Sequence, residues 1–225
     1  NHDNPRMISK VNPDPACHKV LGKLLAMMQL TLKGTPFIYQ GQEIGATNRN
    51  FKSIEDFRDV ESINLYNELK KKMGSEAALK KVLSGSRDHA RTPMQWDVSD
   101  NAGFTKGTPW IGIHGDYSSI NVKSELEDEE SILNFYRSLI RIRKENQAFV
   151  YGDIRFLDKK RKNIFTYIRS YNGDTFLIEC NLCEKPVNRS KAVNMEKELI
   201  LSNYKDISDT DMLRPYEANL YKVKY

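Results

Sequence analysis

The sequence predicts an α/β fold in two parts, a mainly helical part over residues 1–146 and a small antiparallel β domain over residues 147–225. In the first part, segments with helical spacing of apolar residues flank one short apolar run between glycines, which is typical of a buried parallel strand. After Gln147 the pattern changes to short β-rich runs separated by turn residues. A chain of 225 residues is long enough to bury a sizeable core in either part.

The first long helix is expected from about Asp14 to Lys33. Asp14 suits the N-cap and Pro15 the first helical position, because proline lacks the amide that would be unpaired there. Apolar residues recur at helical spacing on more than one face, so this helix should pack on more than one side. Gly34 ends the helix, and Phe37-Ile38-Tyr39 is the expected buried strand.

Residues 46–110 form a long inserted region with secondary structure of its own. One helix is predicted around Ile63 and Tyr66, and a shorter one begins near Ser75, which can cap it. Further along the chain, residues 128–146 are predicted as an amphipathic helix. Its first turn is acidic and its last turn basic, a charge order that complements the helix dipole.

The β domain is predicted from short runs rich in β-branched and aromatic residues. The five predicted strands cover residues 154–157, 164–171, 175–180, 198–201 and 219–223. Asn172-Gly173-Asp174 lies between two of these runs and is a strong signal for a hairpin. Tyr167 and Tyr171 stand at strand spacing, which favours packing in the core or across strands. The alternative, a carbohydrate-binding module, would require a row of exposed aromatics.

Composition and charge argue against several classes of function. The 35 basic and 30 acidic residues give a net charge of +5, and no basic face is interleaved with aromatics, so we predict no nucleic-acid partner. No apolar run approaches the about 18 residues of a membrane span, so we predict no membrane partner. Three cysteines do not make a secreted disulfide framework, which favours a cytoplasmic location. Cys180 and Cys183 lack a second Cys or His pair, so no metal and no cofactor are predicted.

Three stretches of the chain crowd hydrogen-bonding residues between prolines or glycines. They are Asn1-His2-Asp3-Asn4-Pro5-Arg6, the run Gly-Thr-Pro-Phe-Ile-Tyr-Gln-Gly-Gln-Glu-Ile-Gly at residues 34–45, and Arg-Asp-His-Ala-Arg-Thr-Pro-Met-Gln-Trp-Asp at residues 87–97. Together and in this order they resemble the α-glucosidases of glycoside hydrolase family 13. The nearest branch is the group of oligo-1,6-glucosidases, dextran glucosidases and trehalose-6-phosphate hydrolases. The resemblance covers about residues 1–180, and motifs this long and ordered are specific.

The resemblance implies that residues 1–146 are the carboxyl-terminal portion of a catalytic (β/α)8 barrel. This portion would hold the last strand and helices of the barrel, with the helical loop region of about residues 46–110 inserted, and residues 147–225 would be the C-terminal β domain. In such barrels, functional groups lie on the loops at the carboxyl ends of the strands. The polar residues that follow Phe37-Ile38-Tyr39 would therefore be well placed for substrate.

The resemblance also implies roles for individual residues. Asp3 would be the third invariant carboxylate of the family, which grips the 2- and 3-hydroxyls of the glucose in subsite −1 and stabilises the transition state. His2 would donate to the same sugar, and Arg87 would fix the far end of that glucose. Arg91 would brace the loop or reach an outer subsite, and Arg6 would be a brace behind the site.

In this family the nucleophilic Asp and the acid/base Glu lie on earlier barrel strands. The chain is therefore expected to be a fragment of a retaining α-glucosidase that releases α-1,6- or α-1,4-linked glucose from the non-reducing ends of oligosaccharides. By itself the fragment should be inactive and should self-associate. A catalytically inactive family-13-like scaffold or binding protein is the alternative. The sequence leaves open whether the substrate is isomaltose-type, sucrose, maltose or trehalose 6-phosphate.

Overall fold

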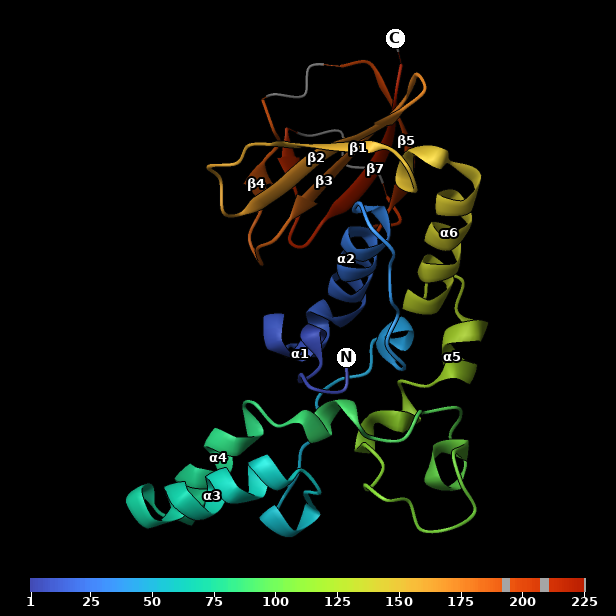
Figure 1. Cartoon of the computed structure of the whole chain (residues 1–225). Coiled ribbons are helices and arrows are strands. Elements are labelled where there is room, and N and C mark those ends of the chain that lie inside the picture. The colour runs from blue at the N-terminus through green and yellow to red at the C-terminus, as the bar shows by residue number, and fades with distance from the viewer. Residues whose placement is uncertain (192–194, 207–210, 225) are drawn as a thin grey trace. The chain divides into compact units, whose positions relative to one another are not determined.

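The computed structural model describes residues 1–191, 195–206 and 211–224 (Figure 1). The chain forms two compact units. The loop unit comprises Asn1–Pro15 and Ile38–Leu133, and the sheet unit comprises Ala16–Phe37 and Asn134–Tyr225. Residues 16–37 thus group with the sheet, although they precede the inserted region in sequence. The assignment of residues 1–146 to one catalytic domain stays a prediction.

The sheet unit is built on a five-stranded antiparallel sheet with the order β1-β2-β3-β7-β5. Its strands are β1 Asp153–Leu157, β2 Ile164–Tyr171, β3 Asp174–Asn181, β5 Lys197–Ser202 and β7 Ala218–Val223. All five predicted strands are confirmed, each within one residue at either end. Two strands of two residues were missed, β4 Val187–Asn188 and β6 Met212–Leu213, which pair with each other. Two residues are too few to carry a periodic pattern.

The predicted hairpin between β2 and β3 is confirmed. Tyr171 pairs with Asp174, so Asn172 and Gly173 form a two-residue loop. Their φ angles are 48° and 88°. Positive φ at both central residues is the requirement of a type I′ turn, which is the reason that the Asn-Gly pair predicts it. Within the sheet, Tyr167 is fully buried, as the core interpretation expected.

Helix α2 (His18–Thr31) packs against β3 and β7 within the sheet unit (Figure 1). The predicted start at Asp14 and Pro15 was wrong, because a 3-10 turn over Pro15–Cys17 comes first and Cys17 takes the N-cap position. The Asn12 side chain accepts the amide of Asp14 at 2.9 Å and holds this residue in a local turn outside the helix. The carboxyl end also comes earlier than predicted, at Thr31.

The expected buried strand at Phe37-Ile38-Tyr39 does not form. The segment makes no strand pairing with any described residue, and the Phe37 side chain is 83% exposed. An apolar run becomes a strand only when a neighbouring strand supplies hydrogen-bond partners. Among the described residues, no other strand lies beside this segment, so its backbone stays irregular.

The helix predicted over residues 128–146 is confirmed as α6 Ile132–Glu145, which begins four residues later than predicted, and a separate short helix, α5 Val122–Glu127, precedes it. Asn121 caps α5 by accepting the amide of Ser124, and Asp128 is extended, which ends that helix. The acidic run therefore lies in α5 and the link rather than in the first turn of α6. One acidic side chain still interacts with the start of α6, because the Glu125 carboxylate accepts the backbone amide of Leu133 at 3.0 Å. The basic last turn of α6 is confirmed.

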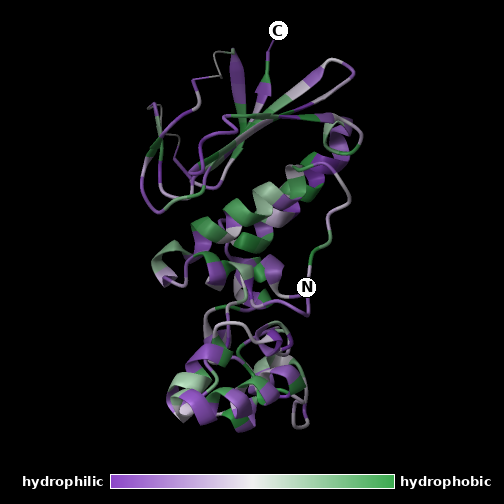
Figure 2. Cartoon of the chain, turned by 60° about the vertical axis from the view of Figure 1, so that its left-hand side comes forward, coloured by the Kyte–Doolittle hydropathy of each residue, from purple (hydrophilic) through white to green (hydrophobic). Residues whose placement is uncertain are grey.

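In the loop unit, α3 (Val60–Met73) and α4 (Ser75–Leu83) form a helical hairpin. Gly74 lies between them with φ of 83°, so Ser75 is the first helical residue rather than the predicted cap. Hydrophobic and hydrophilic bands alternate along both helices (Figure 2). The apolar side faces a core that includes Phe51, Phe57 and Ile111.

Most of the remaining loop unit is irregular and is punctuated by short helical turns. The short elements of the whole chain are α1 Met7–Val11, η1 Pro15–Cys17, η2 Gln42–Ile44, η3 Ile54–Asp56, η4 Arg87–Ala90, η5 Asp100–Gly103, η6 Gly115–Ser118 and η7 Gln147–Phe149. The motif residues 87–97 begin on η4. This motif lies close to the first six residues of the chain through the contacts of Arg6 and Asp3.

Candidate functional site

Arg6 ties three distant segments of the loop unit together. Its side chain is buried, and its guanidinium donates to the backbone carbonyls of Gln40 at 2.6 Å and of His89 and Ala90 at 3.3 Å each. Burial lowers the pKa of Arg6 below its ordinary value, since the charged form loses its water. The guanidinium thereby holds residues 1–6 against residues 34–45 and 87–97.

The backbone at position 41 favours glycine and passes close to Arg6. Gly41 has φ of 84°, and a Cβ atom there would lie 3.1 Å from Ala46 Cβ and 3.2 Å from both terminal nitrogens of Arg6. The Ala90 carbonyl accepts two further donors, the Tyr39 hydroxyl at 3.0 Å and the Gln40 amide at 3.2 Å. The Ala90 carbonyl therefore accepts hydrogen bonds both from Arg6, in residues 1–6, and from Tyr39 and Gln40, in residues 34–45.

The replacement Arg6→Met is expected to lower the free energy of unfolding by about 3 kcal/mol, because buried carbonyls lose their donor. Urea denaturation of the protein measures this change. The matched control is Arg141→Met, since Arg141 lies exposed on α6 and its removal should change stability by less than about 0.5 kcal/mol. Equal unfolding free energies for the two variants would contradict the bracing role.

The four predicted site residues lie together at the edge of this braced region. Asp3 Oδ1 lies 3.4 Å from Arg91 Nη2 and 3.7 Å from Arg87 Nη1. His2 Nε2 lies 3.2 Å from Asp3 Oδ2, and Arg91 Nε donates to the His2 carbonyl at 3.1 Å. Asp3 and His2 are half-exposed or more, whereas the two arginines are mostly covered. In this cluster the Asp3 carboxylate is therefore open to solvent, whereas the two guanidinium groups beside it are mostly covered.

Asp59 belongs to the same cluster and was missed by the sequence analysis. Arg87 donates to Asp59 Oδ1 from both Nε and Nη2, and Ser62 donates to Asp59 Oδ2 at 2.8 Å. Burial opposes ionisation of Asp59, yet the hydrogen bonds from Arg87 and Ser62 outweigh it, so the pKa of this carboxyl lies below its usual range. The same contact raises the pKa of Arg87.

No sequence pattern singled out Asp59, because an isolated aspartate before a helix is the pattern of an ordinary N-cap. The structure places Asp59 at that N-cap position, but its side chain makes no capping hydrogen bond. It points to Arg87 instead, and Glu61 also approaches Arg87 Nη2 at 3.4 Å. The carboxylates that hold Arg87 therefore come from the start of α3, 26 to 28 residues before it in sequence.

Asp88, inside the third motif, fixes the start of α3. Its buried carboxylate accepts the backbone amides of Arg58 at 2.6 Å and of Asp59 at 2.8 Å. Its other oxygen lies 3.6 Å from Arg91 Nη1. The motif therefore carries both arginines and the carboxylate that orients their partner Asp59.

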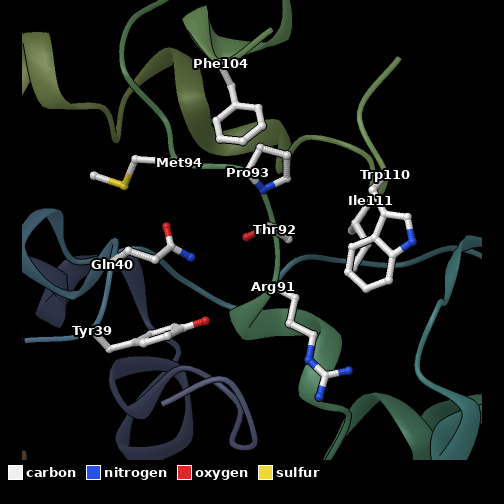
Figure 3. Close-up of a pocket in the computed structure, with 9 residues that line it drawn as sticks. All are labelled: Tyr39, Gln40, Arg91, Thr92, Pro93, Met94, Phe104, Trp110 and Ile111. Carbon is white, nitrogen blue, oxygen red and sulfur yellow. The ribbon is translucent and has the colours of Figure 1, made fainter. Parts of the chain in front are cut away.

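A pocket of about 430 Å³ adjoins the cluster (Figure 3). It is lined by Tyr39, Gln40, Arg91, Thr92, Pro93, Met94, Phe104, Trp110 and Ile111. Arg91 belongs to both the pocket and the cluster. Across the pocket from Trp110 lie Tyr39 and Gln40 (Figure 3). The lining is mostly apolar with a few polar groups, which is the ordinary make-up of a small-molecule site.

A metal centre and a membrane-spanning helix are both absent from the part of the chain that the structure describes. Among residues 1–191, 195–206 and 211–224, no three His, Cys, Asp or Glu side chains gather as metal ligands. In the same ranges, no helix has the length and apolar character needed to cross a membrane. The three cysteines form no disulfide, and burial raises the pKa of Cys180 far above that of a reactive thiol.

Sequence comparisons identify similar proteins along the whole chain. The description "Alpha amylase, catalytic domain" matches residues 1–152. The oligo-1,6-glucosidase of Parageobacillus thermoglucosidasius is 41% identical over 234 residues, which is 100% of this chain and 42% of that protein. The trehalose-6-phosphate hydrolase of Escherichia coli (strain K12) is 39% identical over 224 residues, 97% of this chain and 40% of that protein. The chain thus spans about two fifths of the length of these relatives.

Solved structures agree with these comparisons. The trehalulose synthase MutB from Pseudomonas mesoacidophila MX-45 superposes with a TM-score of 0.93 at 37% identity. The isomaltulose synthase from Klebsiella sp. LX3 gives a TM-score of 0.91 at 33% identity. Each match covers 100% of this chain and 42% of the other chain.

Proposed function

Because the chain belongs to the alpha-amylase family, glycoside hydrolase family 13, we propose that it is the carboxyl-terminal part of a retaining α-glucosidase. Residues 1–146 are then the end of a catalytic (β/α)8 barrel, with an inserted region over about residues 46–110, and residues 147–225 are the C-terminal β domain. The antiparallel sheet and the coverage of 42% of the relatives support this assignment.

The observation that carries the proposal is the half-exposed Asp3 carboxylate beside two guanidinium groups. Oδ1 contacts the two arginines and Oδ2 contacts His2, and each oxygen keeps a lone pair that can accept the 2- or 3-hydroxyl of a glucose in subsite −1. Hydrogen bonds to a charged acceptor are strong, and those that shorten as the sugar ring flattens lower the barrier. His2 donates to the same sugar. The carboxylate thereby stabilises an oxocarbenium-like transition state without bonding to it.

The two arginines have different roles in this proposal. Arg87 fixes the far end of the glucose, and its hydrogen bonds to Asp59 hold its guanidinium in place for that contact. Arg91 donates to the His2 carbonyl and approaches Asp3, so it braces the loop that carries both residues and borders the adjoining pocket. A guanidinium offers several fixed donors, which suits it to hold a loop and a ligand at once.

The reaction that we propose is a double displacement. A carboxylate nucleophile forms a covalent glucosyl intermediate, and an acid/base carboxyl first protonates the leaving oxygen and then deprotonates water. Both groups are assigned to the part of the relatives' length that this chain does not match. The residues of this chain therefore contribute sugar binding and transition-state stabilisation.

The purified 225-residue chain is expected to release no glucose from any α-glucoside, because it lacks the nucleophile and the acid/base group. A coupled glucose assay with isomaltose and maltose at high chain concentration measures this. The positive control is the full-length protein assayed on the same substrates. Turnover by the chain alone would contradict the assignment of both groups to an upstream region.

Hydrolysis of a panel of α-glucosides by the full-length protein tests the proposal as a whole. The panel comprises isomaltose, maltose, sucrose and trehalose 6-phosphate, and we expect α-1,6- or α-1,4-linked glucose to be released from the non-reducing end. The absence of turnover on every member would favour the catalytically inactive scaffold instead. We also propose a cytoplasmic location, supported by three cysteines that form no disulfide, and self-association of the isolated chain, supported by the exposed Phe37.

A further inference from the structure

We propose that His89 is a positioning residue: its neutral ring holds residues 87–91 in place, and its protonation in mild acid releases them and weakens sugar binding. The inference rests on the proposed function, because residues 87–91 carry Arg87 and Arg91, the two arginines beside Asp3. It adds control by pH to the sugar site, through a side chain that does not touch the sugar.

His89 is buried against the core of the inserted helical hairpin. The residue is 2% exposed, and its ring centroid lies 5.3 Å from that of Phe51, which belongs to the core of α3 and α4. Its Nε2 lies 2.8 Å from the carbonyl of Leu83, the last residue of α4. Because a carbonyl can only accept a hydrogen bond, the proton of the neutral ring is on Nε2.

The other ring nitrogen of His89 is not prepared for a second proton. Nδ1 is buried and makes no hydrogen bond to a described residue. Protonation would therefore place a charge and a new donor inside an apolar core. Burial lowers the pKa of His89 below its ordinary value, and this loss of water outweighs the backbone of Leu83 and Arg49, which favours the charged ring.

The charged groups around His89 do not compensate a second positive charge. The Arg6 guanidinium donates to the His89 carbonyl at 3.3 Å. The Arg49 guanidinium lies 4.6 Å from the centroid of the aromatic ring that His89 packs against. His114 disfavours the charged ring and Asp88 favours it, but the Asp88 carboxylate already accepts two backbone amides. The ring is therefore surrounded mainly by cations.

The turn η4 connects both ends of the helical hairpin to the sugar site. His89 holds the end of α4 through the Leu83 carbonyl, and Asp88 holds the start of α3 by accepting the amide of Asp59 at 2.8 Å. Asp59 in turn accepts the hydrogen bonds of Arg87. Expulsion of the His89 ring from the core would therefore displace the backbone that carries Arg87 and loosen the partner that orients it.

The direction of the pH effect follows from the burial of His89. In the unfolded chain a histidine titrates at about pH 6.5, whereas His89 in the folded chain titrates at lower pH. Its contribution to stability is therefore complete above about pH 6.5 and is lost as the pH falls below that value. When the turn is partly released, the apparent affinity for sugar falls with the fraction of competent protein.

The Michaelis constant of the full-length protein for 4-nitrophenyl α-glucoside is the test, measured at about pH 7.5 and about pH 5, on either side of the ordinary histidine pKa. The wild-type KM should rise at least about fivefold in acid, the lower end of ordinary coupling between sites. In His89→Gln the rise should be less than about twofold, because the glutamine amide donates to Leu83 but does not titrate. The catalytic carboxyls titrate alike in both proteins, so kcat should change alike.

Two further variants separate this role from a general effect. His89→Leu provides no donor and should raise KM at both pH values, whereas His89→Gln should restore KM at about pH 7.5. The matched control is His18→Gln, at a half-buried histidine of α2 in the sheet unit, which should keep the wild-type rise in acid. An equal rise of KM in wild type and His89→Gln would overturn the acid-sensitive role. A wild-type KM in His89→Leu at about pH 7.5 would overturn the positioning role.

A full-length protein that is inactive on the glucoside at both pH values would refute the proposed function. Amide hydrogen exchange then tests His89 without any activity. Once corrected for the intrinsic effect of pH, peptides over residues 83–97 should lose protection at about pH 5 in wild type but keep it in His89→Gln. Equal protection in the two proteins at about pH 5 would overturn the inference.

Discussion

Asp3→Asn in the full-length protein is expected to lower kcat on isomaltose about 10³-fold, because the amide replaces a charged acceptor that grips two sugar hydroxyls in the transition state. The Michaelis constant should change much less, since these contacts tighten mainly as the ring distorts. Initial rates over a substrate range separate the two parameters. The thermal midpoint should stay near that of wild type, because Asp3 is half-exposed and its contacts are at the surface.

The matched control for this variant is Asp14→Asn, the same substitution at an exposed aspartate in the segment that precedes α2. It should leave kcat within about twofold of wild type, as is usual for surface changes. A loss of less than tenfold in Asp3→Asn would remove Asp3 from the transition-state role. A large loss in both variants would point to a general effect on folding.

Arg169→Leu is expected to lower the free energy of unfolding by about 4 kcal/mol, which corresponds to roughly 10 °C in Tm. Arg169 is fully buried in the sheet unit, and burial lowers its pKa. Its guanidinium donates to four carbonyls, those of Thr31 at 2.6 Å, Gly152 at 3.0 Å, Phe149 at 3.1 Å and Asp153 at 3.3 Å. These groups lie at the end of α2, in η7 with the turn after it, and in β1.

Leucine fills much of the volume but provides no donor, so the three buried carbonyls of Thr31, Phe149 and Gly152 and the partly buried one of Asp153 would lose their partner. Thermal unfolding followed by circular dichroism measures the effect. Arg155→Leu is the control, because Arg155 is exposed on the neighbouring strand β1 and the same substitution there should cost less than about 0.5 kcal/mol. Similar midpoints for the two variants would show that Arg169 does not join these elements.

Local patterns predicted the sheet far better than they predicted the helical part. The strands β2 and β3 have their own periodicity, and Asn172-Gly173 dictates the turn between them, so each signal lies within a few residues. By contrast, Phe37-Ile38-Tyr39 has an apolar composition typical of a strand, but a strand also needs a neighbour that sequence periodicity cannot supply. Charge order alone placed the start of α6 at about residue 128, whereas Asp128 is extended and the helix begins at Ile132.

In the candidate site, too, residues within local motifs could be predicted, whereas residues placed by tertiary contacts could not. His2, Asp3, Arg87 and Arg91 could be named because they stand in long ordered motifs. Asp59 could not, because its role depends on a contact with Arg87 that crosses 28 residues of sequence. The pocket residue Trp110 stands outside the three motifs, and its exposure and its place in the same pocket as Arg91 follow only from the folded loop. Tertiary contacts, not composition, assembled these groups.

The anomeric form of the glucose that the full-length protein first releases tests the central claim most directly. Proton NMR during the first minutes of hydrolysis of 4-nitrophenyl α-glucoside, whose leaving group is not a glucose, distinguishes α- from β-glucose before mutarotation mixes them. Double displacement retains configuration, so we predict that α-glucose appears first and β-glucose later. Initial release of β-glucose would contradict a retaining α-glucosidase, and no release of glucose would favour the inactive scaffold.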